Sequence, residues 1–263
     1  MATGFFKHIP NINYDFKSDG KYYAAKDLFR KVSVWSYLQE GVTGYSYYRV
    51  TEGERPDVVS AKLYGDSTLY WTFWLVNENL QDHSDWPKSQ QLMEKYLDRK
   101  YSGKCLVAAS PTDIVSYDHS KDENEQAADR KFLLGEKVSQ SSTISGFVTD
   151  VNPTHNRITV QMDPSSTGSF TTSSTVTGAT SGKSFTISSV QNERDAVNHY
   201  LTDVITNSGE VEHTFKTTVA TNNTTVTNEK YELDLNEEKH LIRYIPSRYI
   251  PRVIREFVSL VRD

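Results

Sequence analysis

The spacing of hydrophobic positions changes several times along the chain. Apolar side chains recur at helical intervals in the first segment, which predicts a short helix over 25–38: Leu28, Val32, Trp35 and Leu38. Tyr47-Tyr48-Arg49-Val50 alternates as a short strand does. A helix is then predicted from Pro56 to Tyr64, because a proline at the first helical position loses no needed N–H bond.

A second helix is predicted over 68–77, after a break at Gly65-Asp66 and a cap at Ser67. Its large apolar side chains go right round the circumference: Leu69, Tyr70, Trp71, Phe73, Trp74, Leu75 and Val76. A helix that is apolar on all sides must be covered on all sides. One small sheet cannot do this, so another part of the chain or a partner protein is expected to cover the other face.

Residues 131–190 have the pattern of short, half-buried strands. Apolar side chains alternate with polar ones around Ile144–Val148 and around Ile158–Met162, and less clearly at Leu134-Gly135. Turns are expected at Asn152-Pro153 and Asp163-Pro164. Most of 165–189 is Ser, Thr or Gly, which is typical of a linker, yet apolar residues recur there at strand spacing: Phe170, Val176, Phe185 and Ile187. We expect a small antiparallel barrel, with a flexible stalk as the alternative.

The other segments give weaker patterns. A capped helix is predicted over 84–101, starting at Ser84 or Asp85, and another over 193–205, followed by Thr- and Asn-rich hairpins. A strand is predicted over 241–245, and Pro251 opens a terminal helix. That helix has an apolar stripe that must dock somewhere: Val253, Ile254, Phe257, Val258 and Val261.

These patterns predict an α+β protein made of several modules. The expected order is an N-terminal extended and helical docking segment (1–46), a strand–helix–helix–strand module with a following helix (47–112), a polar connector (113–130), an inserted small β-module (131–190) and a mixed segment ending in an amphipathic helix (191–263).

Composition narrows the function class. Hydrophobic residues make up 37% of the chain, but aromatics reach 12% with 16 Tyr, which favours extensive contact surfaces. A net charge of −5 gives no basic excess for nucleic acid. No apolar run is long enough for a membrane span, and the first residues do not read as a secretion signal. The single cysteine, Cys105, allows no internal disulfide, which fits folding in a reducing cytoplasm.

Candidate chemistry is sparse, and we predict a non-enzyme without cofactor or metal. Asp82-His83-Ser84-Asp85 contains the residue types of a catalytic triad, but helix capping explains it better, because triad groups usually converge from separate segments. The acids around Asp118 and Glu123 lack the order of an EF-hand, so a solvated loop is preferred to a cation site. A buried, inert thiol is preferred for Cys105. No phosphate loop or dinucleotide fingerprint is present.

The 47–80 stretch resembles a LysM module. Four motifs stand in the family's order: Tyr48-Arg49-Val50, Gly53-Glu54, Tyr64-Gly65 and Leu75-Val76-Asn77. The departures are Glu54-Arg55-Pro56, where the family commonly has Asp-Thr in the loop that helps form its glycan groove, and the aromatic second helix. Both departures favour contact with protein over binding of sugar.

The combination more closely resembles the LysM-containing baseplate wedge protein of T-even-like contractile-tailed phages. The residues that carry it are Arg55-Pro56-Asp57, Leu63-Tyr64-Gly65-Asp66, Leu69-Tyr70-Trp71 and Asn77-Glu78-Asn79, with a C-terminal counterpart from Arg243 to Leu260. The resemblance implies a virion protein, assembled in the host cytoplasm, that joins wedges into a sixfold baseplate around the tail hub. Its partners would be other wedge and hub proteins, not nucleic acid or membrane.

Two sets of residues are predicted to make these contacts. The LysM-like set is Tyr48, Arg55, Tyr64, Trp71, Trp74 and Asn77, and the C-terminal set is Arg248, Arg252, Arg255 and Phe257. Two alternatives stay open. One is a peptidoglycan-binding LysM module, and the other is a tail-associated wall hydrolase, which would need a pair of convergent carboxylates. Binding of purified cell wall would favour the first alternative.

Overall fold

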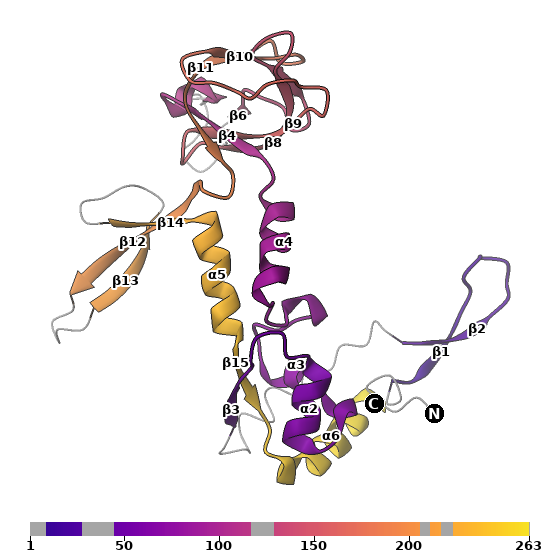
Figure 1. The fold of residues 1–263 in the computed structure, drawn as a ribbon. Helices are drawn as coiled ribbons and strands as arrows, with labels where there is room; N and C mark the ends of the chain where they lie inside the picture. Colours follow the sequence, from indigo (N-terminus) through magenta and orange to yellow (C-terminus); the bar gives the residue numbers. More distant parts are fainter. Residues whose placement is uncertain (1–8, 28–44, 117–128, 206–210, 217–222, 263) are drawn as a thin grey trace, which may run out of the picture. The chain divides into compact units, whose positions relative to one another are not determined.

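A computed structural model describes residues 9–27, 45–116, 129–205, 211–216 and 223–262 (Figure 1). The chain divides into two compact units. Unit 1 consists of Met1–Gln91 together with Leu235–Asp263, and unit 2 consists of Leu92–Asp234. In the part of the chain that is described, no helix is both long and apolar enough to cross a membrane. The chain has mixed helix and strand content, as expected for an α+β protein.

Unit 1 contains a core in the order strand, helix, helix, strand. Its elements are β3 (Ser46–Arg49), α2 (Pro56–Tyr64), the 3₁₀ turn η2 (Ser67–Leu69), α3 (Thr72–Val76) and β15 (Leu241–Tyr244). β3 and β15 pair antiparallel, with Tyr48 opposite Ile242. The predicted strands and first helix are therefore confirmed. The second strand of the core comes from the far end of the chain, beyond the 47–112 boundary predicted for this module.

The turn between the two helices differs from the prediction. Gly65 ends α2 in the left-handed conformation, with φ of 73°, and its N–H donates to Ala61 O at 2.9 Å. Asp66, not Ser67, is the cap, because its side chain accepts the Thr68 N–H at 2.8 Å. The single helix predicted over 68–77 is instead η2 followed by the five-residue α3.

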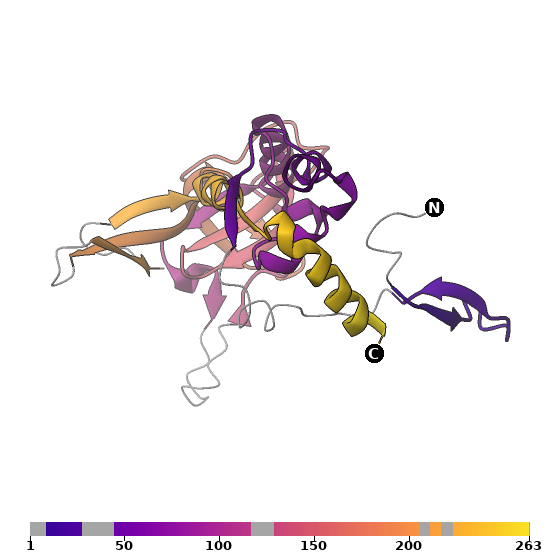
Figure 2. The ribbon, with the colours of Figure 1, turned by 90° about the horizontal axis from the view of Figure 1, so that it is seen from below.

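The end of the chain is helical, as predicted. A 3₁₀ turn, η5 (Ser247–Tyr249), leads into α6 (Ile250–Arg262), the gold helix in Figure 2. Val253 and Phe257 are buried on one face of α6, whereas Arg252 and Arg255 are exposed. The apolar stripe therefore docks within unit 1.

The N-terminal part of unit 1 forms a hairpin of β1 (Asn11–Tyr14) and β2 (Tyr23–Lys26). The Asp15 carboxylate accepts three backbone N–H groups from the connecting loop, including that of Gly20 at 2.8 Å. The helix predicted over 25–38 is wrong at its start, because Ala25 lies in β2; its remainder from residue 28 falls outside the described residues.

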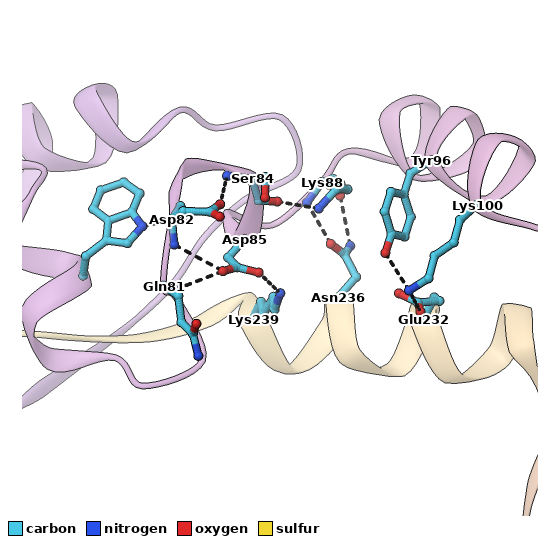
Figure 3. Close-up of polar contacts among 11 residues, drawn as sticks. Gln81, Asp82, Ser84, Asp85, Lys88, Tyr96, Lys100, Glu232, Asn236 and Lys239 are labelled. Carbon is cyan, nitrogen blue, oxygen red and sulfur yellow. Dashed lines mark hydrogen bonds and ion pairs between the residues drawn. The ribbon is translucent and has the colours of Figure 1, made fainter. Parts of the chain in front are cut away.

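Two charged helices, α4 (Gln90–Lys100) and α5 (Asn228–Lys239), cross the division between the units. In unit 1, Asn236 on α5 forms a pair of bonds with the backbone of Lys88, 2.8 Å from its N and 3.0 Å from its O (Figure 3). Lys239 also binds the Asp85 carboxylate at 2.7 Å. Helix α4 begins at Gln90, later than the helix predicted over 84–101. Helix α5 was not predicted.

The unit 2 portions of the same helices carry their own polar contacts. Lys100 Nζ lies 2.6 Å from Glu232 Oε1 (Figure 3). Tyr101 donates to the same oxygen at 2.9 Å. Burial raises the pKa of Glu232, but these bonds outweigh it and leave the pKa below its usual value. Arg194 binds Glu94 on α4 at 2.5 Å and Glu229 on α5 at 2.6 Å. The two helices are thus joined largely through charged and hydrogen-bonding groups.

Unit 2 contains a closed six-stranded barrel in the order β10-β11-β4-β9-β8-β7. The strands are β4 (Lys104–Ala108), β7 (Lys137–Ser139), β8 (Ser145–Asn152), β9 (Arg157–Met162), β10 (Thr175–Gly178) and β11 (Ser184–Asn192). The barrel prediction is confirmed over the stalk alternative. The barrel also takes in β4, which precedes the predicted 131–190 module. Leu134-Gly135 is not a strand, because Gly135 adopts a φ of 80° in a turn.

The remainder of unit 2 is mostly strand. β12 (Val197–Ile205) lies between β13 (Val211–Lys216) and β14 (Asn223–Thr227), and β5 (Val115–Ser116) pairs with β6 (Asp129–Arg130). The helix predicted over 193–205 is wrong. Val197, His199 and Leu201 alternate along a strand, and pairing on both sides of β12 overrides the helical reading.

Candidate docking surface

The loop between β3 and α2 is closed by a carboxylate that faces inward. The Glu54 side chain is 4% exposed and accepts hydrogen bonds from Tyr48 Oη at 3.0 Å and from Thr51 N at 3.1 Å, and it pairs with Lys62. Burial raises the pKa of Glu54, but the bonds from Lys62, Thr51 and Tyr48 lower it to about 2. The Tyr48 hydroxyl is therefore engaged within the loop itself.

Tyr64, at the end of α2, is also directed into unit 1. Its ring stacks on Phe73 with centroids 5.8 Å apart, and its hydroxyl accepts from Thr72 Oγ1 at 3.4 Å. Burial raises the pKa of Tyr64 to about 12. These contacts place Tyr64 in the packing of the core.

Trp71 and Phe257, from the two predicted contact sets, meet each other. Their ring centroids lie 4.7 Å apart, and both side chains are buried together with Ile245, Ile250 and Val253. On another face, Phe73 is completely buried among Val59, Leu80 and other residues of unit 1. Another part of the chain or a partner was expected to cover this helix, and at Trp71 the chain itself does so, because α6 supplies the cover.

Trp74 is half-buried within a cluster of rings. Its centroid lies 4.7 Å from that of His83 and 5.8 Å from those of Tyr70 and Trp86, and its indole N–H donates to Asp82 O at 2.8 Å. Part of its surface remains accessible, so Trp74 is the one tryptophan of the predicted set that can still contact a partner.

Asn77 is buried and holds β15 in place. Its Nδ2 donates to Phe73 O at 2.8 Å and to Arg243 O at 2.9 Å, while its Oδ1 accepts the Arg243 N–H at 2.8 Å. The amide side chain thus binds both backbone groups of one strand residue, as a neighbouring strand would.

The predicted arginines are exposed. Arg55, which precedes α2, pairs with Asp57, and Arg252 pairs with Glu256, both at low burial. Arg248 lies over the Tyr249 ring at 4.6 Å, and Arg255 Nε donates to Pro251 O at 3.3 Å. Surface pairs of this kind contribute little to stability, so these guanidinium groups can exchange their partners at an interface.

Residues 1–129 match a family model described as base plate wedge protein 53. The match supports a baseplate wedge protein of phage, with a structural role and a place in the virion. No curated protein matches the chain. The matched range contains β3, α2 and α3 of the unit 1 core, whereas β15 and α6, which complete the packing of that core, lie outside it.

The outer face of the β3–β15 sheet was not predicted from the sequence as a candidate contact surface. Strand alternation puts Tyr48 and Ile242 inward, and therefore leaves Tyr47, Arg49, Leu241 and Arg243 outward; all four are exposed. The alternation at 47–50 could have identified Tyr47 and Arg49. Arg243 and Leu241, which lie opposite Tyr47 and Arg49, could not be predicted, because the sequence does not show that β15 pairs with β3.

The other candidate chemistry has structural explanations. Asp82 and Asp85 form a capping box on the 3₁₀ turn η3 (His83–Asp85). Capping therefore does explain this stretch, but the cap is Asp82, not Ser84 or Asp85, and it caps η3, not the predicted helix. Cys105 is a buried thiol whose pKa is raised by burial. Within the described ranges, no group of His, Cys, Asp or Glu is arranged to hold a metal ion. The acidic stretch from Asp118 to Glu125 lies outside them.

Proposed function

We propose that this chain is a structural subunit of the wedge in a contractile phage tail, and that it joins wedge proteins to one another around the tail hub in a sixfold baseplate. The observation that carries the proposal is the match of residues 1–129 to the base plate wedge protein 53 family. The matched range includes the motifs from Arg55 to Asn79 that first suggested a wedge protein.

The docking module is proposed to be LysM-like. The order β3, α2, α3, β15 and the left-handed Gly65 after Tyr64 support this interpretation. A protein partner is favoured over glycan, because the loop that would face sugar has its Glu54 carboxylate turned inward, and its backbone at Glu54 O accepts the Trp86 indole N–H at 2.7 Å.

The contact residues are proposed to be the exposed members of the predicted sets. Arg248, Arg252 and Arg255 are exposed and lie close together in the sequence, which gives this segment a local positive charge although the net charge of the chain is −5. Such a charge steers and orients an acidic partner. Arg55 and the accessible part of Trp74 extend the contact, whereas Tyr48, Tyr64, Trp71, Asn77 and Phe257 support it from within unit 1.

Complementation tests this proposal. A phage that lacks the corresponding protein is supplied in trans with the chain or with Arg255→Glu, and baseplates are purified and probed for it. The native chain is expected to co-purify with baseplates. Arg255→Glu is expected to incorporate about tenfold less, since one lost charge contact at an interface costs about 1–2 kcal/mol.

Arg99→Glu is the matched control, because Arg99 is an exposed arginine on α4 in unit 2. It should incorporate normally. Absence of the native chain from baseplates would contradict the proposal. Retention of the chain by purified peptidoglycan, with no incorporation, would favour the glycan-binding alternative.

A further inference from the structure

The β3–β15 sheet has two edges, and their backbone groups point in known directions. The Val50 N–H donates to His240 O at 2.8 Å, which makes this a hydrogen-bonded pair. Hydrogen-bonded pairs alternate along an antiparallel ladder. The backbone groups of Tyr48 and Ile242 therefore face each other, whereas those of Tyr47, Arg49 and Arg243 face away from the partner strand.

The β15 edge is closed. The outward N–H and C=O of Arg243 are both bound by the Asn77 side chain, at 2.8 and 2.9 Å. Because Asn77 is also fixed by its bond to Phe73 O, no incoming strand can reach this edge at Arg243 without displacing a buried amide.

The β3 edge is open within the described part of the chain. There, no hydrogen bond involves the backbone N–H or C=O of Tyr47 or Arg49. An unpaired strand edge is a template for another strand, and proteins usually block such edges. One edge of this sheet is thus blocked by the Asn77 side chain, whereas none of the described residues blocks the other.

The outer sheet face next to this open edge has the composition of an interface. Tyr47 is 59% exposed and lies opposite Arg243, and Leu241 is 51% exposed and lies opposite Arg49. Tyr and Arg are enriched where proteins meet. Neither strand contains an acidic residue. The Arg49 pair with Glu237 is more than half exposed on both sides and is therefore weak.

We propose that β3 receives an extended, acidic segment of another baseplate protein, which adds to the sheet as a third strand beside Tyr47 and Arg49. Main-chain hydrogen bonds to the open edge would supply affinity, and carboxylates on the added strand would face Arg49 on the adjacent strand, with the charge of Arg243 one strand further on. A second copy of this chain fits less well, because its own β3 would bring another arginine and no carboxylate. This inference rests on the proposed function and names the partner's chemistry.

Two substitutions at residue 47 separate the contribution of the backbone N–H to docking from that of the side chain. Tyr47→Pro removes the outward N–H, which β15 does not use, and so blocks strand addition while leaving the β3–β15 ladder intact. Tyr47→Ala removes the ring but keeps the N–H. In the complementation assay, Tyr47→Pro is expected to incorporate about tenfold less than Tyr47→Ala, because buried main-chain groups on the partner lose their bonds.

Photo-cross-linking keeps the proposal testable if Tyr47→Pro fails to fold. The aromatic cross-linker p-benzoylphenylalanine is placed at residue 47, and purified baseplates are irradiated and analysed by mass spectrometry. The expected product joins residue 47 to a segment of a different protein that contains Asp or Glu, and Arg243→Glu should reduce its yield severalfold.

Several outcomes would overturn the inference: normal incorporation of a folded Tyr47→Pro variant, no cross-link in baseplates that contain the chain, or a cross-link to this chain's own residues or to a second copy. If Arg255→Glu abolishes incorporation while Tyr47→Pro does not, the proposed function stands and strand addition alone is wrong. Absence of the native chain from baseplates would reject both.

Discussion

The barrel of unit 2 and the strand–helix–helix–strand core of unit 1 are built from the chain in opposite ways. All six barrel strands lie between Lys104 and Asn192, and they surround a core of aliphatic and phenylalanine side chains. In unit 1, β3 near the start of the chain pairs with β15 near its end, and a buried amide, Asn77, fixes that strand. The barrel is thus built from one stretch of the sequence, whereas the unit 1 core needs two segments that are far apart in the sequence.

The largest effect that would separate the two regions is removal of the chain after Lys239. Unit 1 would lose β15 and α6, which cover Phe73 and Trp71, whereas the barrel would lose no strand. Hydrogen exchange is expected to show the Val59 amide losing protection and the Val160 amide keeping it. Protection retained at both amides would show that the unit 1 core does not need its distant segments.

Trp71→Ala should destabilise unit 1 by about 3–5 kcal/mol, because it leaves a cavity against Phe257. Phe132→Ala in the barrel core is the matched variant, since Phe132 is fully buried. Each variant should lower the protection of amides in its own unit, read by hydrogen exchange. If Trp71→Ala changes stability by less than about 1 kcal/mol, the contact with α6 is not part of the folded core.

Asn77→Ala should cost about 2 kcal/mol, because the Arg243 backbone would lose both of its bonds. Asn79→Ala, at an exposed asparagine two residues away, is the control and should be close to neutral. Denaturant unfolding measures both. If Asn77→Ala is as stable as Asn79→Ala, water replaces the Asn77 amide at the β15 edge.

Acid should weaken unit 1 through Glu54. The pKa of Glu54 in the folded state is about 2, below its ordinary value of 4.5, so its stabilising effect is complete above pH 4.5 and is lost as the pH falls toward 2. We expect a loss of about 1–2 kcal/mol, reduced because Lys62 is half exposed. Urea unfolding of the chain and of Glu54→Gln at pH 6 and pH 3 measures it. An unchanged pH dependence in Glu54→Gln would exclude this carboxylate as the cause.

The smallest expected effect is at the surface of α6. Arg252→Ala removes one exposed pair with Glu256 and should cost no more than about 0.5 kcal/mol. The same variant should still reduce incorporation into baseplates if the proposed interface is correct. Thermal unfolding and the complementation assay together separate a docking role for Arg252 from a stabilising one.

The sequence predicted those parts of the fold in which the pattern is local. Ile158 and Val160 alternate inward on β9, and Pro56 and Gly65 bound α2, so both elements were predicted where they occur. Helix α5 was missed because its residues are mostly charged and form no apolar stripe. Its stability comes instead from contacts such as Glu232 with Lys100, which no local pattern records.

The candidate surface was predicted less well, for a related reason. The aromatic cluster at 69–74 was correctly identified as needing cover, but Phe257, which covers Trp71, was assigned to a partner contact. Sequence periodicity shows which side chains are apolar and on which face they lie. It cannot show whether the covering surface belongs to the same chain, and at Trp71 it does.

Insertion of the barrel between α3 and β15 imposes an order on synthesis. The ribosome releases Trp71 and Phe73 early, and completes β15 and α6 only after every barrel strand has emerged. During that interval the barrel can fold, while Trp71 lacks the cover that α6 gives it and Phe73 lacks its contact with β15. The nascent chain is therefore prone to aggregation through Trp71 until β15 and α6 have been made.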